Sequence, residues 1–270
     1  MINYIGGSIE MKSFVHEELS NKLLNSLNSR ITIPPLTETN PDLTVEDAYE
    51  IQLINVKKLL DDGEIISGKK IGLTSKGMQE LLNITEPDYG HLFKSMEVPN
   101  GGSISIKKVI RPKVEGEVAF VLKEDLIGPN ITLEDVYRAT EYICASIEVV
   151  DSRIHDWRIK LVDTIADNGS SALYILGDKK VPIDSVDLSS VEMRLYKNDQ
   201  LLNSGKGEEV LGNPANGVVW LANKLHEFGV VLRKGEVILS GAFTASPEAY
   251  VGDRFTCNFG ELGEVEVNFK

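Results

Sequence analysis

The sequence is poor in the features that mark several large classes of protein. Its 270 residues include 2 cysteines, Cys144 and Cys257, and 4 histidines. Two cysteines cannot build a disulfide scaffold, and their spacing matches no zinc motif, so a reducing compartment is expected. No apolar stretch reaches membrane-spanning length, and the first residues lack the basic segment and apolar run of a signal peptide. The sequence therefore predicts a soluble, cytoplasmic protein that does not act at a membrane.

Positive charge is also scarce. Lys and Arg number 28 against 41 Asp and Glu, which gives a net charge of −13 at pH 7. This balance argues against nucleic acid as a partner, because the phosphate backbone repels an acidic surface. The sequence also lacks a Gly-x-Gly-x-x-Gly loop, a Walker loop, a His-Glu-x-x-His pair and a Gly-x-Ser-x-Gly elbow. Nucleotide binding, zinc peptidase chemistry and α/β-hydrolase chemistry therefore have no support.

Apolar residues make up 42% of the chain, which is enough for a sizeable core. Helical periodicity over residues 14–28 and 44–61 predicts an N-terminal helical layer, with Thr44 and Asp47 forming a capping box at the start of the second helix and Leu60 on its apolar stripe. From residue 63 onward strands dominate, so we expect an α+β fold with a helical layer at 1–62 and a β-rich core at 63–270, joined in one compact unit. The expected strands are 65–74, 111–122, 144–151, 172–176, 191–196, 237–240, 254–258 and 265–269. The expected helices in this part of the chain are 75–82, 132–142 and 213–229. The connections are expected to include an irregular segment at 33–41, a turn at 86–90 and a long loop at 152–171.

The strand at 111–122 carries the first chemical signal. Its apolar residues alternate, so Glu115 and Glu117 share the opposite face and stand roughly 7 Å apart along the strand. Two carboxylates on one face repel each other unless a hard divalent cation lies between them. A solvated face of an antiparallel sheet is the competing interpretation, and the two glutamates alone favour it.

Two further charged residues fit a cation site. Glu148 lies in an apolar strand, where a carboxylate is costly unless it is paired or metal-bound. It is a third candidate ligand, with an ion pair to Arg153 as the equal alternative. Lys70 lies between Gly68 and Gly72, and glycines in a strand indicate close backbone approach. Together these residues suggest a three-carboxylate cation site with a lysine beside it, suited to an oxygen-rich anionic substrate.

Other candidates carry weaker signals. His155 and Trp157 lie in the polar loop 152–171, and long structured loops are frequently functional. Trp157 is expected to line a pocket, whereas Trp220 is expected in the core. His226 falls late on the helix that begins at Asn213-Pro214, where we expect it on the surface.

Several runs of the sequence resemble the 2-keto-4-pentenoate hydratase family, which also includes 2-oxo-hept-3-ene-1,7-dioate hydratases and 4-oxalocrotonate decarboxylases. The family belongs to the fumarylacetoacetate hydrolase superfamily. The resemblance keeps one order from about residue 44 to the end of the chain. The matching runs are Gly68-Lys-Lys-Ile-Gly-Leu-Thr-Ser75, Glu86-Pro-Asp-Tyr-Gly90, Glu115-Gly-Glu117, Glu148-Val-Val-Asp-Ser-Arg153, Asp163-Thr-Ile-Ala-Asp-Asn168, Asn213-Pro-Ala-Asn-Gly217 and Ile238-Leu-Ser-Gly241.

The resemblance implies a fold, an activity and a set of site residues. The fold would be a mixed β-roll with helices outside, and the reaction a hydration of 2-hydroxy-2,4-dienoates from aromatic meta-cleavage that uses Mg²⁺ or Mn²⁺. Glu115, Glu117 and Glu148 match the family's metal ligands, and Lys70 and Asp88 match its catalytic lysine and acid. The residues that would contact the substrate are Thr74, Asp167, Ser170, Ser240 and Gly241.

The implied chemistry leaves alternatives open. The dienol would be ketonised with Lys70 moving a proton at a lowered pKa, and water placed by Asp88 or a neighbouring residue would add at C4 to give a 4-hydroxy-2-oxo acid. Phe243-Thr244 resembles hydratases of longer dicarboxylic substrates and Thr244-Ala245 resembles 4-oxalocrotonate decarboxylases, whereas Asp156-Trp157 and Pro87-Asp88 resemble hydratases. A decarboxylase is therefore the main alternative, and a C–C hydrolase of acylpyruvates ranks lower because no Glu–His dyad is evident.

The resemblance also implies partners. Members of the family form homo-oligomers, so a homo-oligomer is expected, with a ring of dimers as one form it could take. Some hydratases and decarboxylases of the family associate, and a chain that mainly stabilises such a related pathway enzyme is the non-catalytic alternative.

Overall fold

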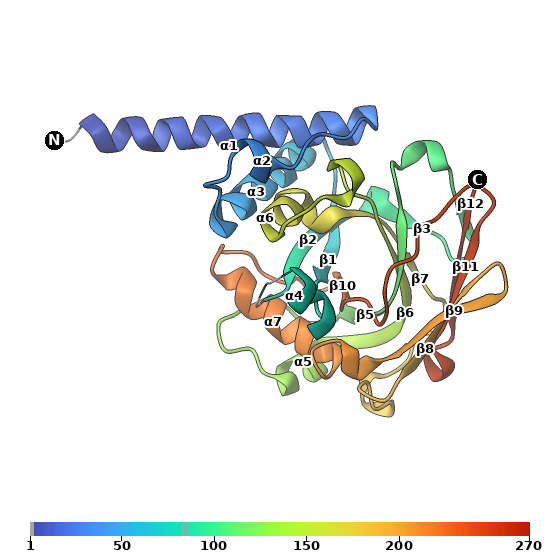
Figure 1. The fold of residues 1–270 in the computed structure, drawn as a ribbon. Helices are drawn as coiled ribbons and strands as arrows, with labels where there is room; N and C mark the ends of the chain where they lie inside the picture. The colour runs from blue at the N-terminus through green and yellow to red at the C-terminus, as the bar shows by residue number, and fades with distance from the viewer. Residues whose placement is uncertain (1–2, 83, 85) are drawn as a thin grey trace.

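The computed structural model describes residues 3–82, 84 and 86–270. Two curled sheets form the body of the molecule, and helices cover its outside (Figure 1). One sheet has the strand order β2-β1-β10-β5-β6-β7-β3, and the other has the order β4-β12-β11-β8-β9. The predicted α+β class, with a β-rich core and peripheral helices, is confirmed. Within the described residues, no helix combines the length and the apolar character needed to cross a membrane.

The strands of the two sheets come from widely separated parts of the chain. The larger sheet contains β1 (Ile66–Gly72), β2 (Asp88–Phe93), β3 (Glu97–Val98), β5 (Lys113–Leu122), β6 (Thr140–Val150), β7 (Ser171–Leu176) and β10 (Val237–Leu239). The smaller sheet contains β4 (Gly102–Ile104), β8 (Glu192–Lys197), β9 (Gln200–Lys206), β11 (Arg254–Asn258) and β12 (Glu264–Phe269).

Helices α1 (Asn3–Ser29) and α3 (Val45–Asp61) form the predicted helical layer along one side of the molecule (Figure 1). The capping box of α3 is present, with the Thr44 side chain accepting from the Asp47 backbone and the Asp47 side chain accepting from the Thr44 backbone. One hydrophobic core runs without interruption from Leu19 and Leu23 of this layer into the sheets. The division of the chain at residue 62 stays a prediction.

The remaining helices are short, except for one. They are α2 (Leu36–Thr39), α4 (Lys76–Leu82), α5 (Leu133–Ala139), α6 (Leu161–Ala166) and α7 (Pro214–His226). Helix α7 begins as predicted, because the Asn213 side chain accepts a hydrogen bond of 2.9 Å from the Ala215 amide. His226 is exposed as expected, and Trp220 packs partly buried against the core.

Strands β5 and β6 form the centre of the larger sheet, and their pairing sets Glu115 opposite Glu148. The apolar face of β5 packs against the smaller sheet, where a Cβ on Gly116 would lie 2.9 Å from the Cys257 sulfur. The other face is also covered, since Glu117 and Glu148 are 0% exposed. The alternation predicted for β5 is confirmed, and the alternative of a solvated glutamate face is wrong.

Several local predictions are wrong. Residues 88–90 lie in buried strand β2 rather than in a turn, because Asp88 pairs with Gly72 of β1. The helix expected to reach residue 142 ends at Ala139, since residues from Thr140 onward pair with β5. Residues 36–39 form a helical turn inside the expected irregular connection. Leu60, expected on the buried stripe of α3, is 41% exposed.

Candidate active site

Three glutamates converge on the covered face of the larger sheet. Glu115, Glu117 and Glu148 each offer a carboxylate oxygen, and these oxygens all lie within 4.8 Å of one another. Two of these glutamates accept hydrogen bonds from neighbouring residues. Glu117 accepts one of 2.7 Å from the Gly241 amide, and Glu115 accepts one of 2.5 Å from the Ser246 hydroxyl. The arrangement follows from the β5–β6 register, because residues that face each other across two strands point to the same side.

Three buried oxygens of this cluster accept no hydrogen bond from the described residues, and Glu148 Oε2 has the Lys70 ammonium 3.6 Å away. Glu117 Oε1 and both oxygens of Glu148 are buried and receive no hydrogen bond from the residues that the structure describes. Burial raises the pKa of Glu117 well above its ordinary value, and it raises the pKa of Glu148 to about 7 although Lys70 opposes that shift. Buried carboxylates without donors suit a hard divalent cation, which neutralises them and accepts oxygen ligands. The residues therefore fit the Mg²⁺ or Mn²⁺ that the sequence analysis expected.

In a second acidic cluster, a histidine and a lysine lie close to the carboxylates. His16, Asp47 and Glu50 meet between α1 and α3, with the two imidazole nitrogens 3.1 Å from Asp47 and 2.9 Å from Glu50. Lys12 lies 2.6 Å from the same Asp47 oxygen. Asp47 thus already has a lysine as its partner, and the contacts of the cluster join the two helices.

Lys70 lies beside the glutamates, with its Nζ 3.6 Å from Glu148 Oε2. Two glycines make room for this side chain: a Cβ on Gly169 would lie 2.7 Å from Lys70 Cε, and one on Gly72 would lie 2.9 Å from Lys70 Nζ. Burial lowers the pKa of Lys70, but the carboxylates of Glu148 and its neighbours outweigh burial and leave that pKa above its ordinary value. Without a metal ion these carboxylates favour the ammonium form of Lys70, and a lowered Lys70 pKa beside a bound metal ion stays a prediction.

Asp88 approaches the same place from β2. A Cβ on Gly72 would lie 2.2 Å from Asp88 Oδ1, so the absence of a side chain at this position leaves room for the Asp88 carboxylate as well as for Lys70. Asp88 Oδ2 accepts a hydrogen bond of 3.1 Å from the Thr164 hydroxyl, while Oδ1 is buried with no donor among the described residues. Sequence reasoning missed Thr164, although it lies in the loop that was singled out by its length.

A cavity of about 600 Å³ opens onto these groups. Lys70, Asp88 and Glu115 line it, together with Thr74 and Ser170. Apolar side chains form much of the remaining wall: Leu73, Val150, Trp157, Ile159 and Phe243. Trp157 thus lines a pocket as expected, whereas His155 lies outside it and contacts Thr32 and Asp156. Charged and polar groups together with apolar walls suit a small unsaturated acid.

The other expected substrate residues lie behind the cavity wall. Gly241 holds Glu117 through its amide and packs against Thr74, where a Cβ would lie 2.3 Å from the threonine hydroxyl. Ser240 is 0% exposed, and its hydroxyl has no partner among the described residues. Neither residue is among those that line the cavity.

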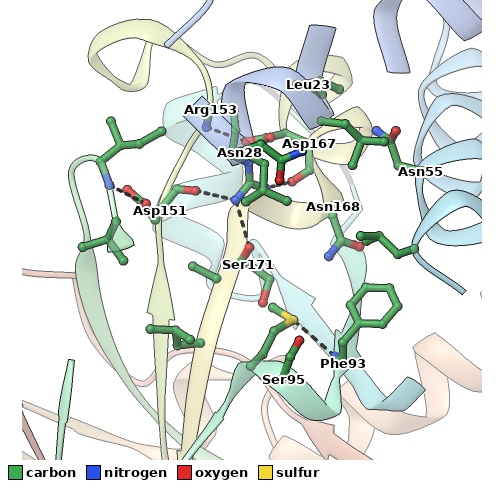
Figure 2. A pocket seen from close by; sticks show the side chains of 18 of the residues that line it. Leu23, Asn28, Asn55, Phe93, Ser95, Asp151, Arg153, Asp167, Asn168 and Ser171 are labelled. Atoms are coloured by element: carbon green, nitrogen blue, oxygen red, sulfur yellow. Dashed lines mark hydrogen bonds and ion pairs between the residues drawn. The ribbon is translucent and has the colours of Figure 1, made fainter. Parts of the chain in front are cut away.

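Asp167 forms an ion pair with Arg153. Its Oδ1 lies 2.5 Å from Arg153 Nε, and its Oδ2 accepts a hydrogen bond of 3.0 Å from the Ser170 hydroxyl. Figure 2 shows this pair beside a second cavity, of about 360 Å³, on the side of α1 and α3. Arg153 therefore pairs with Asp167, and the alternative of an Arg153–Glu148 pair is wrong. Asp167 orients Ser170, which lines the larger cavity.

Comparison with known proteins agrees with this geometry. Residues 75–270 match the model of the fumarylacetoacetate (FAA) hydrolase C-terminal family. The chain belongs to this family, which confirms the resemblance seen in the sequence. It is similar to a 2-hydroxyhexa-2,4-dienoate hydratase of Comamonas testosteroni, with 44% identity over 96% of this chain and 98% of the relative. It is also similar to a 2-hydroxypent-2,4-dienoate hydratase of Pseudomonas putida, with 47% identity over 79% of this chain and 96% of the relative.

Among solved structures, the chain resembles a 4-oxalocrotonate decarboxylase from Pseudomonas putida G7 complexed with magnesium and adipate. The TM-score is 0.93 and the identity 32%, over 96% of this chain and 98% of the other. A fumarylpyruvate hydrolase from Pseudomonas aeruginosa, at 13% identity and a TM-score of 0.59, shares the fold over 74% of this chain and 88% of its own.

Proposed function

We propose that the protein is a hydro-lyase of aromatic meta-cleavage degradation. It adds water to a 2-hydroxy-2,4-dienoate of the 2-oxopent-4-enoate type and forms a 4-hydroxy-2-oxo acid. The observation that carries this proposal is the cluster of Glu115, Glu117 and Glu148, with buried oxygens that accept no hydrogen bond from the described residues, beside a cavity that Glu115 lines together with Lys70 and Asp88. Relatives that are 44% and 41% identical over nearly the whole chain are named as hydratases of such dienoates.

The three glutamates would hold Mg²⁺ or Mn²⁺. The similar decarboxylase is described as complexed with magnesium in one structure and with calcium in another, which supports a hard divalent ion at such a site. When bound, the ion would polarise the substrate's carboxylate and 2-oxygen and favour the enolate form. The β5–β6 pairing supports this role, because it fixes all three side chains on one face of the sheet.

Lys70 and Asp88 would move the protons. As an ammonium, Lys70 can donate a proton to C5 of the dienol and take up the proton that the 2-hydroxyl loses, which gives the α,β-unsaturated 2-oxo acid. Asp88 Oδ1 has no donor among the described residues, so it can accept a proton from water as the water oxygen bonds to C4. Return of this proton to C3 of the resulting enolate gives the 4-hydroxy-2-oxo acid. Thr164 fixes the other oxygen of Asp88 and so directs Oδ1. Thr74 and Ser170 would bind the substrate from the cavity wall.

A decarboxylase on the same scaffold is the second candidate. The similarity to a 4-oxalocrotonate decarboxylase over nearly the whole chain supports it, because that enzyme has the same fold. The hydratases of Comamonas testosteroni and Pseudomonas putida are more similar in sequence, which favours hydration. An acylpyruvate hydrolase ranks lower, since no histidine is among the described residues that line the larger cavity.

The test is the loss of dienol absorbance from 2-hydroxypenta-2,4-dienoate in the presence of purified protein. We expect loss that depends on Mg²⁺ or Mn²⁺ and stops when a chelator is added. Unchanged absorbance with this substrate and with the longer dicarboxylic dienols would refute the proposal. Release of CO₂ from 4-oxalocrotonate, without hydration of any dienol, would establish the decarboxylase instead.

The assembly state belongs to the same proposal. A homo-oligomer, with a ring of dimers as one form, and association with a related pathway enzyme are what the family resemblance implies. Sedimentation of the purified chain, alone and mixed with such an enzyme, would test both.

A further inference from the structure

Lys113 is a cation in the cavity wall that the mechanism above does not use. It lies on β5 two residues before Glu115 and lines the same cavity as Lys70 and Asp88. Its ammonium stands over the Trp157 ring, 4.3 Å from the ring centroid. The contact is of the cation–π type, which holds a lysine in one place without using up its hydrogen-bond donors.

The acids near Lys113 are occupied by other groups. Glu248 lies 2.8 Å from Arg111 and accepts a hydrogen bond of 2.5 Å from the Tyr250 hydroxyl. Glu115 accepts from Ser246 and belongs to the glutamate cluster. Within the described part of the chain, the Lys113 ammonium makes no ion pair and no hydrogen bond, so its donors are free to bind an anion that enters the cavity.

The position of Lys113 along the strand indicates which part of a substrate it meets. The backbone of Lys70 pairs with Leu239, which pairs with Ala119, so its side chain starts beyond Glu117 and reaches back to Glu148. Lys113 stands beyond Glu115 at the other end of the same face. The two lysines therefore approach the glutamates from opposite ends of this face. A substrate whose reacting carbons extend toward Lys70 and Asp88 leaves its acid group on the side of Lys113.

We infer that Lys113, braced by Trp157, binds the C1 carboxylate of the 2-oxo acid substrate. The inference rests on the proposed function, because the direction of the carbon chain follows from the roles of Lys70 and Asp88. The subsite is built: Trp157 Nε1 donates a hydrogen bond of 3.0 Å to the Arg111 carbonyl, and this bond fixes the indole beside Lys113. Asp156 and Trp157 both adopt left-handed backbone conformations, with φ of 52° and 56°, which non-glycine residues rarely do.

Ligand binding tests the inference apart from turnover. The affinity of 2-oxopentanoate, an unreactive monocarboxylate, would be measured by calorimetry at saturating Mn²⁺ for the wild type, Lys113→Met and Lys113→Arg. A charge-assisted hydrogen bond is lost in Lys113→Met, so we expect roughly 10- to 100-fold weaker binding. Lys113→Arg keeps the charge and is expected to lie within a few-fold of the wild type. In turnover, Lys113→Met should raise KM more than it lowers kcat.

Lys180→Met is the matched control. Lys180 also stands over an aromatic ring, 4.5 Å from the centroid of Tyr142, but it lies outside the cavity. Binding in this variant should equal that of the wild type. The same measurements with 2-oxoadipate, a dicarboxylate, distinguish the two acid groups of a longer substrate. We expect Lys113→Met to bind 2-oxopentanoate and 2-oxoadipate more weakly by similar factors.

Two results would overturn the inference. Wild-type affinity of Lys113→Met for 2-oxopentanoate would show that no carboxylate binds Lys113. Weakened binding of 2-oxoadipate alone would assign Lys113 to the distal carboxylate. Failure of the proposed function is a separate result, because the wild type itself would then neither bind 2-oxopentanoate nor consume the dienol.

Discussion

At the scale of single residues, the account depends on charge that the protein does not compensate by itself. Glu117 and Glu148 are fully buried, and three of their four carboxylate oxygens receive no hydrogen bond in the described part of the chain. Burying carboxylates in this way costs free energy unless a cation binds. Natural proteins retain such costly groups mainly where they serve binding or catalysis.

The first prediction concerns one ligand. Glu115→Gln should lower metal-dependent turnover by about 100-fold or more, because an amide oxygen is a weaker ligand than a carboxylate. The fold should remain, since Glu115 is only partly buried and glutamine has the same shape. Glu264→Gln, on an exposed position of β12, is the control. Circular dichroism and kinetics at saturating Mg²⁺ measure both effects, and full activity of Glu115→Gln would disprove its role as a ligand.

The second prediction concerns pH. Burial raises the pKa of Glu148 to about 7 in the metal-free protein, so between its ordinary value of 4.5 and 7 the folded state binds more protons than the unfolded state. The metal-free protein therefore loses stability as pH rises through this window. Added Mg²⁺ or Mn²⁺ should raise the melting temperature at pH 8 by roughly 5 °C or more, and much less at pH 5. Equal stabilisation at both values, measured by calorimetry, would contradict the coupling.

At the scale of elements, the site is made by strands that bring distant residues to one face. The β5–β6 register joins the glutamates, and β1 and β2 add Lys70 and Asp88. The loop that leads from residue 155 to β7 closes the cavity, and Gly169 in that loop lies directly on Lys70. Its φ of 60° is left-handed, so both its backbone and its missing side chain matter.

A third prediction separates the two reasons for a glycine at position 169, the left-handed backbone and the lack of space for a side chain. Gly169→Ala should reduce turnover about 10-fold or more, because the new methyl group would displace Lys70. Gly212 has a φ of 80°, but a Cβ there would meet no described atom within 4 Å, so Gly212→Ala carries only the backbone cost of roughly 1 kcal/mol. In denaturant Gly169→Ala should lose at least as much stability as Gly212→Ala, and only Gly169→Ala should lose activity. Equal activity of the two would show that Lys70 is not held by this contact.

Some elements were predictable from the sequence for clear reasons. The Thr44–Asp47 capping box, the Asn213-Pro214 helix start and the alternation of β5 are local signals, and the structure confirms them. Strand β2 was missed because Pro87, Asp88 and Gly90 are typical of turns. Gly90 is needed instead for close approach, since a Cβ there would lie 2.3 Å from the Asn168 carbonyl oxygen.

Some residues of the candidate site were likewise predictable from the sequence, and others were not. The glutamates follow from strand periodicity and the cost of a buried carboxylate, but only pairing between β5 and β6 brings Glu148 to the other two. The glycines on either side of Lys70 pointed to that lysine, and the family resemblance added Asp88 and Ser170. The partners of these residues, such as Thr164 with Asp88, depend on tertiary contacts that no local pattern encodes.

At the scale of the whole molecule, the helical layer and the sheets share one core. Gln52 of α3 donates hydrogen bonds to the carbonyls of Tyr89, 2.9 Å away, and Ile165, 2.8 Å away. These bonds tie the helical layer to β2 and to α6, which carry Asp88 and Thr164. Stability of the helical layer and geometry of the site should therefore change together.

The fourth prediction follows from this shared core. Leu23→Ala, at a position that is 3% exposed between α1 and the core, should cost about 2–5 kcal/mol. Phe14→Ala, at a 70% exposed position of the same helix, is the control and should change little. Calorimetry of the wild type and of Leu23→Ala should each show a single transition. Two separate transitions would indicate that residues 1–62 and 63–270 unfold independently.

The central claim is that the buried glutamates and their neighbours direct the addition of water to a dienoate. The most direct test is the identity of the product formed from 2-hydroxypenta-2,4-dienoate with Mg²⁺, measured by mass spectrometry and NMR. The account predicts a product heavier than the substrate by one molecule of water, with a hydroxyl group at C4 and a ketone at C2. A product of unchanged mass, or one that has lost CO₂, would contradict it.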